Sequence, residues 1–324
     1  MHRTEYFQQV IEEEINKISF PHSPEDLYDP IRYMISLGGK RLRPALLLMA
    51  HELFGGKWEN AMKPALAIEL FHNFTLLHDD IMDKAPLRRG QPTVHSRWNS
   101  DIAILAGDTL FVKACEMMSE VDDRHLRKTL RLYYACAAAV CEGQQYDMTF
   151  ESASSVGADD YISMISAKTA SLLACSLAIG ALTADAGEED QNRLHAFGKN
   201  LGIAFQLHDD VLDVYGDEKK FGKQPGGDIV SNKKTFLLLS AFQSATPETR
   251  RELERLTKET SMPSAEKVAS VKTIYSQLGI REKAEAEMDR YYQLAVSNLD
   301  AIDRPEDSKA CLREFAGHLM VRET

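Results

Sequence analysis

Residues 76–83 read Leu-Leu-His-Asp-Asp-Ile-Met-Asp, and residues 206–213 read Gln-Leu-His-Asp-Asp-Val-Leu-Asp. Each stretch places the pattern Asp-Asp-x-x-Asp in an apolar context with helical spacing. On a helix, the first and third aspartates lie one turn apart on one face, and the second lies beside them. Like charges at this spacing cost a helix roughly 0.2–0.5 kcal/mol per pair, so we expect a bound cation to compensate them.

The residue types favour one kind of cation. Carboxylate oxygens without thiolates suit a hard ion such as Mg²⁺, which usually binds one or two carboxylates together with substrate phosphates. A single acidic cluster is most often a solvated surface. Two copies, each following a leucine and a histidine, make that interpretation a minor one. The pair therefore predicts a site where two carboxylate groups hold a diphosphate through metal ions.

The overall composition limits the possible partners. The 324-residue chain has a formal net charge of −11 and is 44% hydrophobic, which is enough apolar material for a sizeable core. A nucleic-acid-binding protein usually presents a basic face, so the acidic balance argues against a nucleic-acid partner. The acidic background also makes each local cluster of lysine and arginine more informative.

Cysteine use and the apolar runs indicate a cytoplasmic protein. The five cysteines are odd in number and lack Cys-x-x-Cys spacing, so we expect reduced core thiols and no disulfide or zinc site. The N-terminal residues show no signal-peptide apolar region. The longest uncharged apolar run, residues 169–184, is shorter than the roughly 20 residues of a membrane span. We expect a buried helix there and no membrane-spanning segment.

Helix signals run along the whole chain, whereas strand alternation and tight Asn-Gly or Asp-Gly turns are absent. Proline and acidic residues mark helix starts at residues 23–26, 246–248 and 304–307. Long stretches with helical patterning cover residues 61–83, 158–183 and 190–215. No linker or low-complexity tract separates them. The sequence predicts an all-α fold and a single domain over residues 1–324.

Basic and turn-forming residues follow the acidic motifs. The segments 84–93 and 216–228 are rich in turn residues and in lysine or arginine, and loops beside a rigid metal site often carry phosphate clamps. A further basic segment, Gly38-Gly39-Lys40-Arg41-Leu42-Arg43-Pro44, precedes an apolar helix. Arginine forks bind phosphate bidentately. Two basic clusters, at residues 38–44 and 88–90, therefore imply a second diphosphate that side chains hold without metal.

These motifs together resemble the trans-isoprenyl diphosphate synthases of the polyprenyl synthetase family, in particular the short-chain geranylgeranyl and farnesyl types. Gly-Gly-Lys-Arg-x-Arg-Pro, His-Asp-Asp-Ile-Met-Asp with Arg-Arg-Gly-x-Pro-Thr, Lys168-Thr169 and residues 206–213 occur in the family's order. The resemblance implies a large helical bundle around a deep central cavity, usually a homodimer. It also implies that isopentenyl diphosphate is condensed with dimethylallyl, geranyl or farnesyl diphosphate, with three Mg²⁺ ions and with released diphosphate as the base.

The resemblance also assigns roles to residues. Metal ligands would be Asp79, Asp80, Asp83, Asp209 and Asp213, which with Asp210 and Lys168 form the catalytic set. The allylic diphosphate would contact Arg88, Lys168, Thr169, Gln206, Lys223 and Lys233. Isopentenyl diphosphate would contact Lys40, Arg43, His72 and Arg89. Metal and cations would stabilise the charge on the leaving diphosphate, so that an allylic carbocation forms. For His72 an ordinary core role is the alternative, and for Lys223 and Lys233 an ordinary loop role.

Product length is expected to depend on the helix before the first motif. Phe74 and Thr75 would lie about 6–7.5 Å below Asp79, on its side of the helix. By resemblance, bulk at these positions limits elongation, and one aromatic with one small residue favours twenty carbons. The sequence thus predicts geranylgeranyl diphosphate as the main product, with farnesyl diphosphate as the alternative. Phe74 as ordinary core is the remaining interpretation.

Three other functions stay open at this point. A class I terpene cyclase would share the first motif, but it normally lacks a second Asp-Asp-x-x-Asp and needs no isopentenyl diphosphate site. A helical metal phosphohydrolase would need further histidines at matching depth. A non-catalytic synthase subunit typically loses aspartates from these motifs, and both motifs are intact in this chain.

Overall fold

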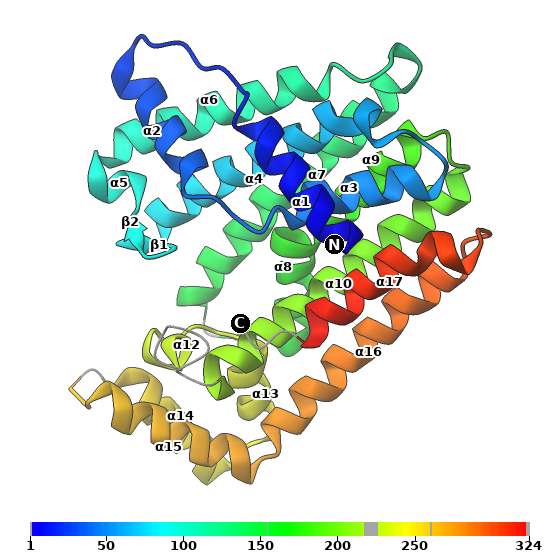
Figure 1. The fold of residues 1–324 in the computed structure, drawn as a ribbon. Coiled ribbons are helices and arrows are strands. Elements are labelled where there is room, and N and C mark those ends of the chain that lie inside the picture. The colour runs from blue at the N-terminus through cyan, green and yellow to red at the C-terminus, as the bar shows by residue number, and fades with distance from the viewer. Residues whose placement is uncertain (1, 154, 217–225, 260, 322–324) are drawn as a thin grey trace. The chain divides into compact units, whose positions relative to one another are not determined.

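The computed structural model describes residues 2–153, 155–216, 226–259 and 261–321, and this part of the chain is almost entirely α-helical (Figure 1). The helices are α1 (Arg3–Ile15), α2 (Glu25–Ser36), α3 (Leu42–Leu53), α4 (Met62–Met82), α5 (Val94–Arg97), α6 (Ser100–Met118), α7 (Asp123–Ser152), α8 (Ala158–Ile165), α9 (Ser171–Thr183), α10 (Glu188–Tyr215), α12 (Gly227–Val230), α13 (Phe236–Ser244), α14 (Pro247–Lys258), α15 (Ser264–Gln277), α16 (Ile280–Asp300) and α17 (Glu306–Val321). The predicted all-α class is confirmed.

The chain divides into two compact units, each assembled from segments that are distant in sequence. Unit 1 comprises Met1–Tyr134, Cys175–Leu194 and Arg304–Leu312, and unit 2 comprises Ala135–Ala174, His195–Asp303 and Arg313–Thr324. The first acidic motif therefore belongs to unit 1 and the second to unit 2. The single domain over residues 1–324 stays a prediction.

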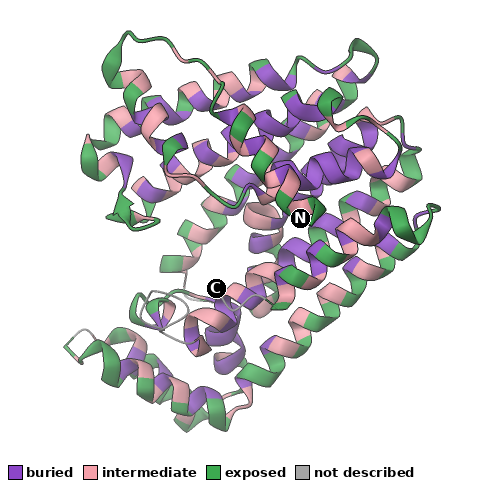
Figure 2. Ribbon diagram, viewed as in Figure 1, coloured by how far each residue is buried: buried purple, intermediate pink, exposed green. Residues whose placement is uncertain are grey.

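Helices α3 and α4 supply much of the interior of unit 1. Nearly every residue of α3 is buried, so the helix is coloured almost wholly as buried in Figure 2. Helix α4 is buried along most of its first half and packs against α3 and α6. Burying a leucine or phenylalanine side chain stabilises a fold by about 1.5–3 kcal/mol. This packing fixes the C-terminal end of α4, where Asp79, Asp80 and Asp83 lie.

A short hairpin follows α4, in the segment that the sequence assigned to an irregular loop. β1 (Leu87–Arg88) pairs antiparallel with β2 (Gln91–Pro92). The two residues between the strands, Arg89 and Gly90, have φ angles of 52° and 75°. A type I′ hairpin turn needs positive φ at both of its two central positions, usually from Asn-Gly or Asp-Gly. Here Arg-Gly supplies the two positive φ angles. The hairpin therefore lacks the Asn-Gly or Asp-Gly pair by which a sequence usually predicts such a turn.

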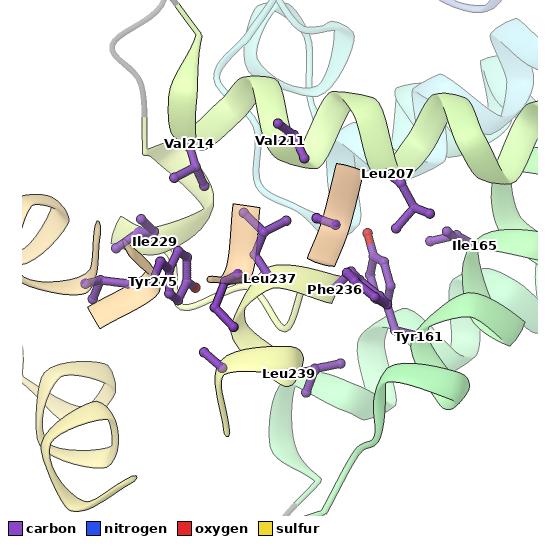
Figure 3. Packing of buried hydrophobic residues seen from close by; sticks show 14 of the residues in the cluster. Tyr161, Ile165, Leu207, Val211, Val214, Ile229, Phe236, Leu237, Leu239 and Tyr275 are labelled. Carbon is purple, nitrogen blue, oxygen red and sulfur yellow. The ribbon is translucent and has the colours of Figure 1, made fainter. Parts of the chain in front are cut away.

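The core of unit 2 holds α10 in place. Figure 3 shows Leu207, Val211 and Val214 of α10 above a cluster that includes Tyr161 of α8 and Leu237 of α13. These α10 residues follow one another at spacings of four and three, as expected for one face of a helix. The acidic motif thus sits on a helix whose opposite side is locked by apolar packing.

The predicted helix over residues 158–183 consists of three parts. Helices α8 and α9 are joined by a π-helical turn, Ser166–Ala170, which contains Lys168 and Thr169. Such π turns are frequent at functional sites. The whole stretch is long and apolar enough to cross a membrane, but 61% of its most apolar window is buried within the protein. This matches the expected buried helix.

The cysteines differ partly from the expectation. None of the five, all of which lie in the described residues, forms a disulfide. Cys136 and Cys175 are buried as predicted, but Cys141 is exposed. The prediction of core thiols is therefore wrong for Cys141, because its place on α7 faces away from the core.

Candidate active site

The three aspartates of the first motif differ in burial. Asp80 is buried and accepts hydrogen bonds from Arg88, at 2.9 Å from Nε and 2.7 Å from Nη2. Burial alone would lower the pKa of Arg88, but the bonded carboxylate of Asp80 outweighs it and raises that pKa. Arg88, predicted to contact the allylic diphosphate, is thus held against Asp80. Asp79 is partly buried, and Asp83, the C-cap of α4, is exposed.

The predicted isopentenyl diphosphate residues also lie in unit 1. Arg43 Nη1 is 3.2 Å from His72 Nε2. Burial, followed by the charge of Arg43, holds the pKa of His72 well below its usual range, so the ring is neutral at pH 7. Burial and the charge of Arg41 lower the pKa of Arg89. Cations this close favour a bound anion, because an anion relieves their mutual repulsion. Lys40 is exposed on the loop before α3.

The second motif has a buried middle aspartate with a different partner. Tyr161 Oη donates to Asp210 Oδ2 at 2.6 Å, and Gln206 Nε2 donates to Oδ1 at 3.2 Å. Figure 3 shows the Tyr161 hydroxyl directed toward α10. Burial raises the pKa of Asp210 to about 7, although both hydrogen bonds oppose this. Asp210 therefore lies on the core side of α10, whereas Asp209 and Asp213 are only partly buried.

Asp213 organises the backbone that follows the second motif. Its carbonyl accepts a hydrogen bond from Gly226 N at 2.6 Å, and its Oδ2 accepts one from Asp228 N at 3.0 Å. The charge of Asp228 favours the protonated form of Asp210, and that of Lys233 favours the ionised form, so both lie near this carboxyl. Sequence reasoning included Asp228 in a basic loop without giving it a role. Lys223 lies outside the described residues.

Lys168 has a carboxylate partner that sequence reasoning missed. Its Nζ donates to Asp147 Oδ2 at 2.6 Å. Close by, Thr169 Oγ1 donates to Gln206 Oε1 at 3.2 Å, so the predicted contacts Thr169 and Gln206 are brought together. A Cβ on Gly143 would lie only 2.3 Å from Lys168 N. A glycine inside a helix often marks such a close approach, and Gly143 was the available signal.

The donor set fits Mg²⁺. In each motif the first and third aspartates are less buried than the middle one. The described residues contain no group of three or more His, Cys, Asp or Glu arranged to hold a metal. Carboxylate oxygens are the donors that Mg²⁺ takes, one or two at a time, before water and phosphate oxygens complete its shell.

Comparison with known proteins identifies the family of the chain. The family model described as "Polyprenyl synthetase" matches residues 24–278. The chain belongs to the polyprenyl synthetase family. It is 38% identical over 304 residues to the geranylgeranyl diphosphate synthase of Methanosarcina mazei, covering 93% of this chain and 91% of that protein. It is 37% identical over 253 residues to the geranylfarnesyl diphosphate synthase of Natronomonas pharaonis, covering 72% and 74%.

A solved structure shows the same fold. The geranylgeranyl pyrophosphate synthetase of Pyrococcus horikoshii superimposes with a TM-score of 0.92 at 34% identity, covering 99% of this chain and 97% of that one. The predicted polyprenyl synthetase family, isoprenoid-synthase fold and trans-prenyltransferase class are confirmed. The roles of individual site residues stay predictions.

In this family member, the predicted product-length residue Phe74 lies in an aromatic cluster of unit 1. Its ring centroid is 5.2 Å from that of Phe111, 5.5 Å from that of Phe71 and 4.8 Å from that of His78. Phe71 is buried, whereas Phe74 and Thr75 are partly buried. Phe111 supports Phe74 from α6 and was not identified from the sequence.

Proposed function

We propose that the protein is a Mg²⁺-dependent synthase that condenses isopentenyl diphosphate with an allylic diphosphate and forms geranylgeranyl diphosphate as its main product. The observation that carries the proposal is the pair of acidic motifs, each on a packed helix with its first and third carboxylates less buried than the middle one. Membership of the polyprenyl synthetase family supports the reaction class. The names of similar synthases support the twenty-carbon product.

Two sets of side chains bind the two diphosphates. Asp79, Asp83, Asp209 and Asp213 supply oxygens to Mg²⁺, three ions in all, and Asp80 is a further candidate ligand. When bound, Mg²⁺ neutralises charge on the leaving allylic diphosphate. Lys168, Thr169, Gln206, Lys233 and Arg88 orient that diphosphate. Lys40, Arg43, His72 and Arg89 bind isopentenyl diphosphate without metal, with neutral His72 as a hydrogen-bond donor. Lys223 belongs to the proposed allylic set by sequence alone.

Chain length is set in unit 1 by Phe74, supported by Phe111. A growing hydrocarbon favours apolar surroundings below the anchored diphosphate, and a ring at this depth stops its extension. Thr75 is small and leaves room for the fourth isoprene unit. Farnesyl diphosphate is the shorter alternative. Because one relative is a geranylfarnesyl diphosphate synthase, product analysis should also look for a twenty-five-carbon product.

Two wider properties belong to the same proposal. Ile104, Leu105 and Val112 expose 41%, 58% and 66% of their surface along α6, and an exposed apolar face of this kind marks an interaction surface. We assign it to a homodimer, and sedimentation equilibrium that returned the mass of one chain would refute that assignment. Five cysteines without a disulfide support a reducing, cytoplasmic location, which fractionation of the source cells can check.

Product analysis tests the proposal. The protein is incubated with labelled isopentenyl diphosphate, dimethylallyl diphosphate and Mg²⁺, and the dephosphorylated products are separated by chain length. We expect a twenty-carbon alcohol as the main species, release of inorganic diphosphate, and loss of both in EDTA. A cyclic hydrocarbon, or no elongation at all, would refute the reaction class, and a fifteen-carbon main product would favour the alternative.

A further inference from the structure

The basic loop before α3 contains an arginine that turns away from solvent. Arg41 is the N-cap of α3 and has left-handed backbone angles, φ 47° and ψ 34°. This conformation is uncommon for a residue with a side chain, and it persists where surrounding contacts hold it. The side chain of Arg41 is 1% exposed, whereas its neighbour Lys40 is exposed. The kink therefore separates Arg41 from the cations that are proposed to bind diphosphate.

Protein groups engage every part of the buried guanidinium. Nη1 donates to Glu69 Oε1 of α4 at 2.6 Å, Nε donates to Glu12 Oε2 of α1 at 2.8 Å, and Nη2 donates to the carbonyl of Ile35 at 3.4 Å. Burial alone would lower the pKa of Arg41, but the two glutamates outweigh it and raise that pKa. A buried cation with two carboxylates is a structural group, so Arg41 is not a diphosphate ligand.

Helix α1 holds the loop at a second point. Gln8 Nε2 donates to the carbonyl of Lys40 at 2.6 Å. Gln8 and Glu12 are four residues apart, so both contacts come from one face of α1. The helix is itself anchored by buried Phe7, Ile11 and Ile15, and it packs against α3 and α4 (Figure 1). Two adjacent loop residues, Lys40 and Arg41, are thus tied to one rigid element.

The same contacts set the loop against the other proposed isopentenyl diphosphate ligands. Glu69 lies one turn before His72 on α4, and His72 contacts Arg43 at 3.2 Å. A Cβ on Gly39 would lie 2.9 Å from Arg89 Nη2 and 3.3 Å from Arg41 Nη1. A side chain at position 39 would therefore require the Arg89 guanidinium to shift. The position of Arg41 therefore determines how Lys40 and Arg43 are placed relative to His72 and Arg89.

We propose that Gln8 and Glu12 of α1 form a positioning clamp that holds Lys40 and Arg41, and thereby sets the affinity for the diphosphate that is bound without metal. The clamp rests on the proposed function, because it takes Lys40 and Arg43 as ligands of isopentenyl diphosphate. Gln8, Glu12 and Arg41 touch no substrate and act through the loop. Opening the clamp lets the loop move, so that binding a diphosphate must first reorder it.

Steady-state kinetics of a clamp variant, Gln8→Ala with Glu12→Gln, test the proposal. We expect the KM for isopentenyl diphosphate to rise roughly tenfold, the loss of about one charge-assisted contact. The KM for the allylic diphosphate and kcat at saturation should change less than about twofold. The matched control is Gln9→Ala with Glu13→Gln, a hydrogen-bonded pair on the exposed face of the same helix, and it should behave as wild type.

A second variant and a second measurement test whether the change in KM comes from the loop. Glu12→Gln alone keeps an acceptor for Arg41 and should raise the same KM by roughly threefold. Hydrogen exchange should be faster at residues 38–43 in the clamp variant than in the control. An equal rise in both KM values would overturn the clamp. The clamp would also be overturned if the clamp variant matched the control in its exchange rates and KM values. In either case, an active wild type would still support the synthase. A wild type without condensation activity would overturn both.

Discussion

The two acidic motifs have the same sequence pattern, but the protein treats their middle aspartates differently. Asp80 is buried against the guanidinium of Arg88, which is itself one-quarter exposed. Asp210 is buried against the hydroxyl of Tyr161 and the amide of Gln206, and its pKa rises to about 7. One motif therefore pairs its buried carboxylate with a cation, whereas burial brings the buried carboxyl of the other close to a neutral acid at pH 7.

The outer aspartates are the common element. Asp79 and Asp83 in unit 1, like Asp209 and Asp213 in unit 2, are less buried than the middle residue of their motif. We infer that the outer carboxylates bind metal in both motifs, and that the middle aspartate also fixes each helix through its protein partner. Substitutions can separate these two roles.

The largest expected effect is on turnover. Asp79→Ala and Asp209→Ala should each lower kcat by roughly a thousandfold or more, because charge on the leaving diphosphate loses its stabilisation. Circular dichroism and melting temperature should stay close to those of the wild type. A variant with less than about a tenfold loss would remove that motif from the proposed metal site, since tenfold corresponds to only about 1.4 kcal/mol.

The next effect is on stability, and it distinguishes the middle aspartates. Asp80→Asn removes an ion pair with a buried carboxylate and should lower the free energy of unfolding by about 1.5–3 kcal/mol. Asp210→Asn keeps an acceptor for Tyr161 and replaces a near-neutral group, so it should cost less than about 1 kcal/mol. Urea denaturation at pH 7 measures both. Equal losses would mean that Arg88 and Tyr161 are equivalent partners.

A change of product tests the aromatic cluster of unit 1. Phe74→Ala removes the ring that Phe111 supports, and it should lengthen the main product by at least one isoprene unit. Thin-layer or liquid chromatography of the dephosphorylated products reads the length directly. A folded variant with the wild-type product would show that the floor of the cavity lies elsewhere.

The smallest effect is on how stability depends on pH, which should have opposite signs for His51 and Asp210. It is measured on metal-free protein in EDTA. Burial lowers the pKa of His51 in unit 1, so the stability that neutral His51 contributes is present above pH 6.5 and is lost as pH falls. The raised pKa of Asp210 in unit 2 acts oppositely, with stability lost as pH rises from 3.8 toward about 7. Melting temperatures are measured between pH 4 and about 8. His51→Gln should reduce the loss of stability as pH falls, and Asp210→Asn should reduce the loss as pH rises. The idea fails if both variants keep the wild-type profile.

Local patterns in the sequence predicted the fold well. The helix starts near Pro247 and Glu306, the helix that ends in the first motif, and the helix that ends in the second all match the structure. Thr246 caps α14 through Thr249 N, as the Thr-Pro-Glu pattern indicates. These features depend on neighbours within one turn, which is the range that periodicity and capping describe.

The partners of the site residues could not be predicted in this way. Tyr161 reaches Asp210 across 49 positions, and Asp147 reaches Lys168 across 21, so no local pattern connects them. The left-handed backbone of Arg41 also has no sequence signature, because arginine rarely adopts it. Such contacts depend on which helices pack together, and local sequence patterns do not reveal that packing.

The central claim is that both motifs bind Mg²⁺ for one allylic diphosphate, and calorimetry with an unreactive allylic thiolodiphosphate tests it most directly. Binding to the wild type should require Mg²⁺ and be lost in EDTA. Asp79→Ala and Asp209→Ala should each weaken Mg²⁺-dependent binding by roughly ten- to a hundredfold, the loss of a charged contact. Wild-type affinity in either variant, or unchanged binding in EDTA, would contradict the claim.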